Sequence, residues 1–112
     1  MESEQRFWDL AEPLLLTRAG VTRSTMMGFP CLRINGGFFA SLDRKNESLV
    51  VKLPAERVTE LVSAGKAQPF APNGRTFREW ASVPVTASGT WSDLLEEALA
   101  FVQTIQSSRA RR

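Results

Sequence analysis

One turn in the middle of the chain most strongly constrains what this sequence can fold into. The triplet Asn-Gly-Gly at 35–37 separates two runs in which apolar and polar residues alternate, and Asn and Gly tolerate the positive φ that tight hairpin turns demand. A longer polar turn follows at 43–47. The strands predicted around these turns are 21–26, 31–35, 38–42 and 49–53. This pattern predicts an antiparallel meander in the middle of the chain.

Helical periodicity flanks the meander. The predicted helices are 4–19, 54–65 and a third from Thr90 onward, and the remaining strand segments are 68–70 and 76–83. The third helix carries the clearest apolar stripe of the chain. The resulting order, α-β-β-β-β-α-β-β-α, predicts an α+β fold with an antiparallel or mixed sheet of five to six strands and about three helices, mainly on one face.

Length and charge predict one domain with a basic end. We expect a single domain over residues 1–106 and a disordered basic tail over 107–112. Three of the 14 basic residues, Arg109, Arg111 and Arg112, lie in this tail, which leaves 11 basic against 12 acidic residues, a net charge of −1, on the rest. Because nucleic-acid-binding domains usually carry positive charge on the folded body, the basic pI of about 9.2 is weak support for nucleic acid.

Missing residue types exclude much chemistry. The chain has no His and a single Cys, Cys31, which removes most metal sites, Ser-His and Cys-His nucleophile pairs and His proton shuttles. We therefore expect a non-enzymatic protein without a metal or cofactor, with Cys31 as a small buried side chain. No apolar stretch approaches the ~20 residues of a membrane span, and the polar, acidic start is unlike a signal peptide. These features predict a cytoplasmic protein that does not engage a membrane.

Strand parity divides the side chains of the predicted sheet between two faces. The set assigned to the helix-packed core is Leu32, Ile34, Phe38, Ala40, Leu42, Leu49, Val51, Leu53, Phe77 and Val83. The opposite set is Cys31, Arg33, Phe39, Ser41, Val50, Lys52, Arg78 and Trp80. Since the second set mixes cations with aromatic rings, it is the candidate functional surface.

Four residues of the second set, Arg33, Lys52, Arg78 and Trp80, are the candidate binding residues. The leading hypothesis is a protein partner or a second copy of the chain, because aromatic residues and Arg are enriched in interface cores. The first alternative is nucleic acid or another anionic ligand, with Phe39 and Trp80 as stacking planes. The second is a His-independent enzyme that works through carboxylates or Lys in a deep pocket. The simplest alternative is an ordinary, partly solvated sheet face without a binding role, on which the aliphatic parts of Lys and Arg cover apolar neighbours.

Several motifs also carry a family resemblance. They are the strand at 27–35, the hairpin Ile-Asn-Gly-Gly-Phe-Phe-Ala at 34–40, Leu-Val-Val-Lys-Leu-Pro at 49–54, Pro-Phe-Ala-Pro-Asn-Gly-Arg-Thr-Phe-Arg-Glu-Trp at 69–80, and the helix opened by Trp91. In this order and spacing the chain resembles the TfoX N-terminal domain family and the related MmcQ/YjbR-like family over roughly residues 5–105. The resemblance implies a small mixed sheet with flanking helices and a regulatory role through binding. It brings no catalytic residues, and the DNA-binding label of some YjbR-like proteins comes without a motif that explains it.

Overall fold

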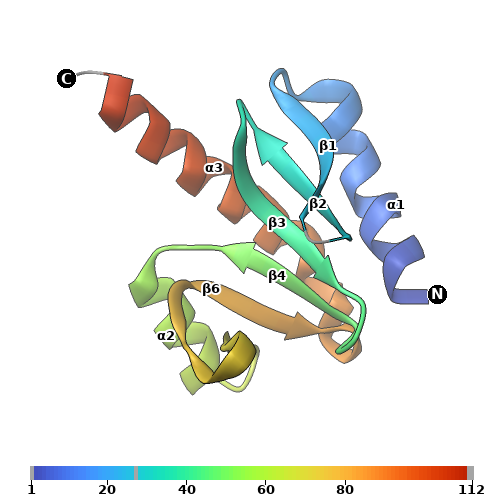
Figure 1. The fold of residues 1–112 in the computed structure, drawn as a ribbon, viewed down its shortest axis with the longest axis vertical. Coiled ribbons are helices and arrows are strands. Elements are labelled where there is room, and N and C mark those ends of the chain that lie inside the picture. The colour runs from blue at the N-terminus through green and yellow to red at the C-terminus, as the bar shows by residue number, and fades with distance from the viewer. Residues whose placement is uncertain (1, 27, 111–112) are drawn as a thin grey trace.

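A computed structural model describes residues 2–26 and 28–110 and has the predicted α+β architecture (Figure 1). The elements in chain order are α1 (Glu2–Thr17), β1 (Val21–Met26), β2 (Phe29–Ile34), β3 (Gly37–Asp43), β4 (Ser48–Lys52), α2 (Ala55–Ser63), β5 (Gln68–Phe70), a 3-10 turn (Pro72–Gly74), β6 (Phe77–Pro84), a second 3-10 segment (Val85–Thr90) and α3 (Trp91–Ala110). The six strands form one antiparallel sheet in the order β1-β2-β3-β4-β6-β5. The predicted order of elements is confirmed.

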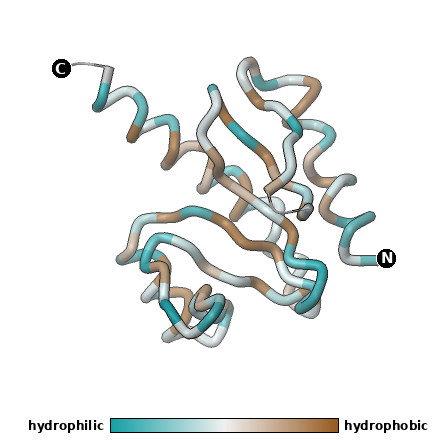
Figure 2. Tube along the Cα trace, in the orientation of Figure 1, coloured by the Kyte–Doolittle hydropathy of each residue, from teal (hydrophilic) through white to brown (hydrophobic). Residues whose placement is uncertain are grey.

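The three helices gather on one face of the sheet. Figure 1 shows α3 running behind β3 and β4. Helix α1 contacts β1 at one end of the sheet, and α2 contacts β6 and β5 at the other. The sheet and Leu53, just after β4, contribute Leu32, Ile34, Phe39, Ala40, Leu42, Leu49, Val51, Leu53, Ala81 and Val83 to one hydrophobic cluster. The helices contribute Phe7, Ala11, Val58, Leu61, Trp91 and Leu95 among others. In Figure 2 the turn between β3 and β4 is a hydrophilic stretch next to hydrophobic β4. Burial of the apolar helix stripes against this face drives the fold.

The central hairpin forms at the predicted place. Asn35 and Gly36 have φ values of 48° and 84°, and such positive φ is what a two-residue hairpin turn requires. Gly37 begins β3 directly under α3, since a side-chain carbon there would lie 2.8 Å from Nε2 of Gln106. The same amide donates a hydrogen bond of 2.7 Å to the carbonyl oxygen of Ile34. The end of α3 is therefore held on the hairpin.

Helix α3 extends further than the sequence predicts. It runs through Ala110, so the expected disordered tail (107–112) is helical over 107–110, and the last two residues lie outside the described part of the chain. No Gly or Pro interrupts this stretch, and the positive charge of Arg109 suits the negative end of the helix dipole. Among the helices of the described residues, none is both long enough and apolar enough to cross a bilayer.

A β-bulge in β3 overturns the predicted sides of two phenylalanines. Leu32 lies opposite Ala40, but the next pair is Arg33 opposite Phe38, which leaves Phe39 as an extra residue. Phe39 is fully buried in the core, whereas Phe38 is half-buried and lies with Arg33 on the other face. The core position predicted for Phe38 and the outer position predicted for Phe39 are both wrong, because strict alternation does not hold across a bulge.

The predicted core position of Phe77 is also wrong, since its side chain is 41% exposed. The pairing of β4 with β6 ends at Lys52 and Trp80, so Phe77 lies beyond the end of β4. Its strand partner is instead Phe70 of the short edge strand β5, with 6.0 Å between the two ring centroids. Phe77 therefore lacks the neighbouring strand that covers the core residues of β6.

Ion pairs fasten the helices to one another and to a turn. Arg57 of α2 pairs with Glu97 of α3 at 2.8 Å. Arg44, in the turn between β3 and β4, pairs with Glu4 of α1 at 2.9 Å. The Arg44 guanidinium donates two hydrogen bonds to this carboxylate and holds the pKa of Glu4 below its ordinary value. These cations have their counter-charges within the chain.

Candidate functional site

The candidate site lies on the face of the sheet opposite the helices, here called the open face, which Figure 1 views from the front. Paired residues of antiparallel strands share a face, so the strand register aligns rows of side chains across the sheet. One row of the open face crosses all six strands and consists of Ser24, Cys31, Ser41, Val50, Ser82 and Gln68. Beside this row lie two further pairs on the same face, Arg33 opposite Phe38 and Lys52 opposite Trp80. The open face is thus a row of mostly small side chains beside two pairs of cations and rings.

The centre of the open face is closely covered, although no helix of the described residues lies on it. Cys31 is fully buried and Val50 is 3% exposed, yet neither belongs to the core cluster. Their cover therefore comes from neighbouring side chains of the same face. Burial raises the pKa of the Cys31 thiol, which keeps the thiol protonated and unreactive at neutral pH. The predicted burial of Cys31 is confirmed.

Arg33 and Phe38 form the first cation–aromatic pair of the open face. The Arg33 guanidinium carbon lies 4.3 Å from the centroid of the Phe38 ring. Arg33 is half-buried, and its Nε atom is buried without a hydrogen-bond partner among the described residues. No carboxylate in the described part of the chain forms an ion pair with Arg33. This guanidinium is therefore partly desolvated and has no counter-charge of its own.

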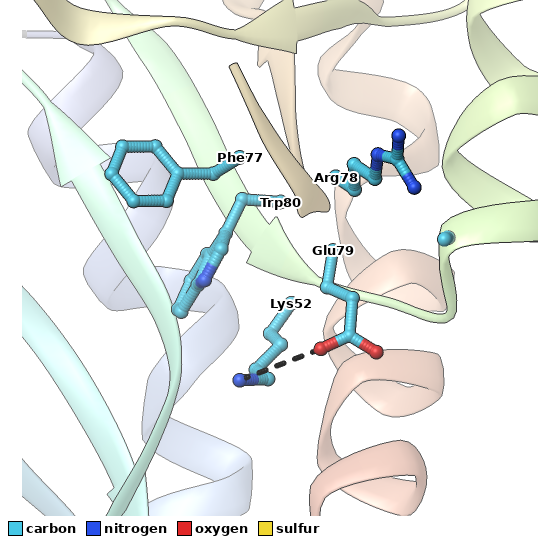
Figure 3. Close-up of a pocket in the computed structure, with 6 residues that line it drawn as sticks. Lys52, Phe77, Arg78, Glu79 and Trp80 are labelled. Carbon is cyan, nitrogen blue, oxygen red and sulfur yellow. Dashed lines mark ion pairs between the residues drawn. The ribbon is translucent and has the colours of Figure 1, made fainter. Parts of the chain in front are cut away.

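Lys52 and Trp80 form the second pair, on the neighbouring strands β4 and β6. Lys52 lies opposite Trp80, and its Nζ is 5.7 Å from the centroid of the Trp80 ring. The ammonium group also faces a Glu79 carboxylate oxygen at 3.9 Å, the ion pair dashed in Figure 3. Beyond the last pair shared by β3 and β4, Ala40 and Val51, the two strands diverge in Figure 1. The two cation–aromatic pairs thus lie on separate arms of the sheet.

An open pocket of about 460 Å³ adjoins the second pair. Its lining residues are Lys52, Ala55, Phe77, Arg78, Glu79 and Trp80. In Figure 3 the Phe77 and Trp80 rings lie toward one side of this pocket, whereas Arg78 is directed away from them. Arg78 is exposed at the rim of this pocket. The pocket can receive an apolar group next to a cation, on an open surface.

The structure places three of the four candidate residues on the open face, Arg33 on one arm of the sheet and Lys52 with Trp80 on the other. The fourth, Arg78, is directed away from the Trp80 ring (Figure 3). Sequence parity missed Phe38, which takes the stacking position that the sequence assigned to Phe39. No residue type that commonly marks a bulge, such as glycine, stands at position 38 or 39, so the sequence carried no local signal for this exchange.

The carboxylates and other potential metal ligands of the described residues are dispersed. Within residues 2–26 and 28–110, no three His, Cys, Asp or Glu side chains gather as metal ligands would. The carboxylate at the pocket, Glu79, is 45% exposed and already faces Lys52. This carboxylate is open to solvent and lacks the enclosed, desolvated setting that acid–base catalysis uses. What the open face offers is cations on aromatic planes.

Comparison with protein-family models, with curated proteins and with solved structures found no match to this chain. The resemblance to the TfoX N-terminal and MmcQ/YjbR-like families therefore rests on the sequence motifs alone.

Proposed function

We propose that this chain is a non-enzymatic protein-binding module whose open face receives an acidic segment of a partner protein. The observation that carries the proposal is Arg33, a half-buried cation stacked on a ring with no carboxylate beside it in the described residues. Arg44 and Arg57, by contrast, each have a carboxylate partner within the fold. Because a partly desolvated guanidinium gains most from a charge-assisted hydrogen bond, a carboxylate from outside completes this site.

The second pair supplies a further anchor for the same segment. Glu79 approaches Lys52 only to 3.9 Å, so a partner carboxylate can replace this long contact with a closer one. Phe38 and Trp80 are half-buried rings beside the two cations and offer apolar contact area. Rings and Arg are the side chains that carry most binding energy at protein interfaces. The partner segment therefore combines acidic residues with at least one apolar anchor.

A protein partner fits these observations better than nucleic acid. Single-stranded nucleic acid binds by stacking bases on free aromatic planes within a positively charged groove. Here each ring already carries a cation of the chain itself, at 4.3 Å over Phe38 and 5.7 Å over Trp80. Outside the last six residues the chain has 11 basic against 12 acidic groups, a net charge of −1. The regulatory role implied by the family resemblance agrees with binding to a protein.

Selection from a random peptide library displayed on phage tests the proposal. We expect the wild-type protein to enrich peptides with Asp or Glu next to an aromatic or aliphatic residue. Synthetic peptides of the enriched sequences lose at least tenfold in affinity for Arg33→Glu, about 1.4 kcal/mol. The matched control is Arg6→Glu, which makes the same charge change on an exposed side chain of α1, on the helix-covered side of the sheet. It is expected to keep affinity within about twofold.

Three results contradict the proposal. The first is a selection that enriches no acidic peptides. The second is an equal loss of affinity in Arg33→Glu and Arg6→Glu, which indicates a general charge effect. The third is tight, Arg33-dependent binding of a single-stranded oligothymidylate with steep salt dependence, which assigns the face to nucleic acid instead.

A further inference from the structure

The sheet ends in two edge strands that are protected to different degrees. β5 has three residues and contains Pro69, and its register shifts before Phe70. Short length, proline and irregular pairing are the usual protections of a sheet edge against further pairing. β1 has six residues in unbroken register with β2 and contains neither proline nor a bulge. The edge at β1 is therefore the one that can accept another strand.

The one charged side chain of β1, Arg23, does not lie where it would oppose pairing at this edge. Arg23 lies opposite Leu32, a core residue, so it is on the helix-covered face. Its guanidinium carbon lies 4.3 Å from the centroid of the Trp8 ring of α1. The positive charge of Arg23 therefore lies against α1 and not along the outer edge of β1. On the open-face side, β1 presents the uncharged Thr22, Ser24 and Met26.

Strand alternation determines which backbone groups of β1 remain free. The N–H of Asn35 donates to the carbonyl oxygen of Gly20 at 2.9 Å. In an antiparallel ladder the backbone of every second residue from that point, including Ser24, faces β2. The N–H and C=O groups of Arg23 and Thr25 consequently point away from the sheet. Both residues are exposed, so these groups are accessible to a partner strand.

We propose that β1 pairs antiparallel with β1 of a second copy of this chain, about a two-fold axis at Ser24. In this register Arg23 of each copy lies opposite Thr25 of the other, and each such pair exchanges both backbone hydrogen bonds. Centring the axis on Arg23 instead would place two like charges directly opposite each other, which is destabilising. A reversed copy of β1 is therefore a suitable partner for β1, and two-fold pairing is the commonest form of self-association.

Self-pairing at β1 would also extend the candidate binding surface. The row that ends at Ser24 would continue into Ser24 of the second copy, since strand pairing keeps the open faces of the two sheets on the same side. The joined surface would present Arg33 twice. A partner with two acidic segments would then bind more tightly than one segment alone, through effective concentration.

Substitution of Thr25 by proline tests the pairing. Thr25→Pro removes one of the outward N–H groups and leaves the bonds between β1 and β2 intact, because that N–H does not face β2. By light scattering over a concentration series, we expect the wild-type protein to approach twice the chain mass of 12.5 kDa. Thr25→Pro is expected to stay at the mass of one chain with an unchanged circular dichroism spectrum.

Cross-linking tests the register. Ser24→Cys places two thiols opposite each other at the axis, in a non-hydrogen-bonded pair whose Cα atoms lie about 4.5 Å apart. The experiment uses a Cys31→Ala background, since Cys31 lies opposite Ser24 within the chain and would compete for the new thiol. Thr22→Cys in the same background is the matched control. It shares the strand and the face, but its two copies would be about four residues apart in this register.

The expected result is a disulfide-linked dimer of Ser24→Cys on mild oxidation and little or none of Thr22→Cys. The proposal is overturned by a wild-type protein that stays at the mass of one chain, by a dimer that persists in Thr25→Pro, or by equal cross-linking of both cysteine variants. The test is independent of the proposed function, because Arg33→Glu leaves β1 intact and is expected to retain the dimer, whereas Thr25→Pro is expected to retain binding of acidic peptides.

Discussion

Phe38 and Phe39 are adjacent in the chain, yet they belong to the two different faces of the sheet. On the covered face, Phe39 is fully buried in a core cluster that includes apolar side chains from all three helices. On the open face, Phe38 is half-buried under Arg33, beside a row of mostly small residues. The covered face thus carries the stability of the fold, and the open face carries side chains that stability does not require. The predictions below test this division.

The largest difference is expected between alanine substitutions of the two phenylalanines. Phe39→Ala removes a fully buried ring from the core and should lower the free energy of unfolding by about 3–5 kcal/mol. Phe38→Ala removes a half-buried ring and one cation–aromatic contact, so the expected cost is about 1 kcal/mol. Urea denaturation followed by circular dichroism measures both. Equal losses would show that the faces do not divide the stability in this way.

Two tryptophans repeat the comparison at a second position. Trp91 is fully buried, and its indole N–H donates to the carbonyl oxygen of Val83 at 3.2 Å. Trp91→Phe removes this hydrogen bond and leaves a void in the core, so we expect a loss of about 2–3 kcal/mol. Trp80 is half-buried on the open face, and Trp80→Phe should cost below about 1 kcal/mol. Reversal of this order in the same denaturation assay would contradict the division.

Much of the covered face could be predicted from sequence because the signals there are local. Asn35 and Gly36 specify the hairpin turn by the φ values that they tolerate, and the helices follow from their apolar periodicity. Strand parity then places Leu32 and Val51 correctly, since their strands are regular at these positions. These elements depend on interactions between near neighbours in the chain.

The remaining assignments failed where strand pairing, rather than the strand itself, decides the side. Phe38 and Phe39 exchange faces because of a bulge that depends on how β3 meets β2. Phe77 occupies an alternate position in β6 that the sequence assigns to the core, but the pairing of β4 with β6 ends at Trp80, and the Phe77 side chain is exposed. Arg78 lies at the same irregular end of β6, and its side chain is directed away from the Trp80 ring (Figure 3). Strand length and register are set by long-range contacts, so a single sequence reports them poorly.

A third prediction uses Cys31 to examine the cover of the open face. Its thiol is fully buried and its pKa is raised by burial, so alkylation by iodoacetamide should be slow in the native wild-type protein. If side chains of the same face supply the cover, Phe38→Ala should accelerate alkylation several-fold. Trp80→Ala, on the other arm of the sheet, is the control and should change the rate little. Equal acceleration would indicate general loosening of the protein rather than loss of a local cover.

The smallest expected effect is on the pH dependence of stability, in which the paired cation Arg44 is compared with Arg33. Arg44 holds the pKa of Glu4 below its ordinary value of 4.5 through hydrogen bonds, so the folded state favours the carboxylate. The stability from this pair is therefore fully present above pH 4.5 and is lost as the pH falls through the lowered pKa of the folded state. The melting-temperature difference between wild type and Glu4→Gln should be constant from neutral pH to about 5 and shrink below that.

Arg33 has no carboxylate partner in the described residues, so the melting-temperature difference between wild type and Arg33→Gln should stay constant over the same pH range. A matching decline for Arg33→Gln would reveal a carboxylate at the open face and remove the contrast between the two sides.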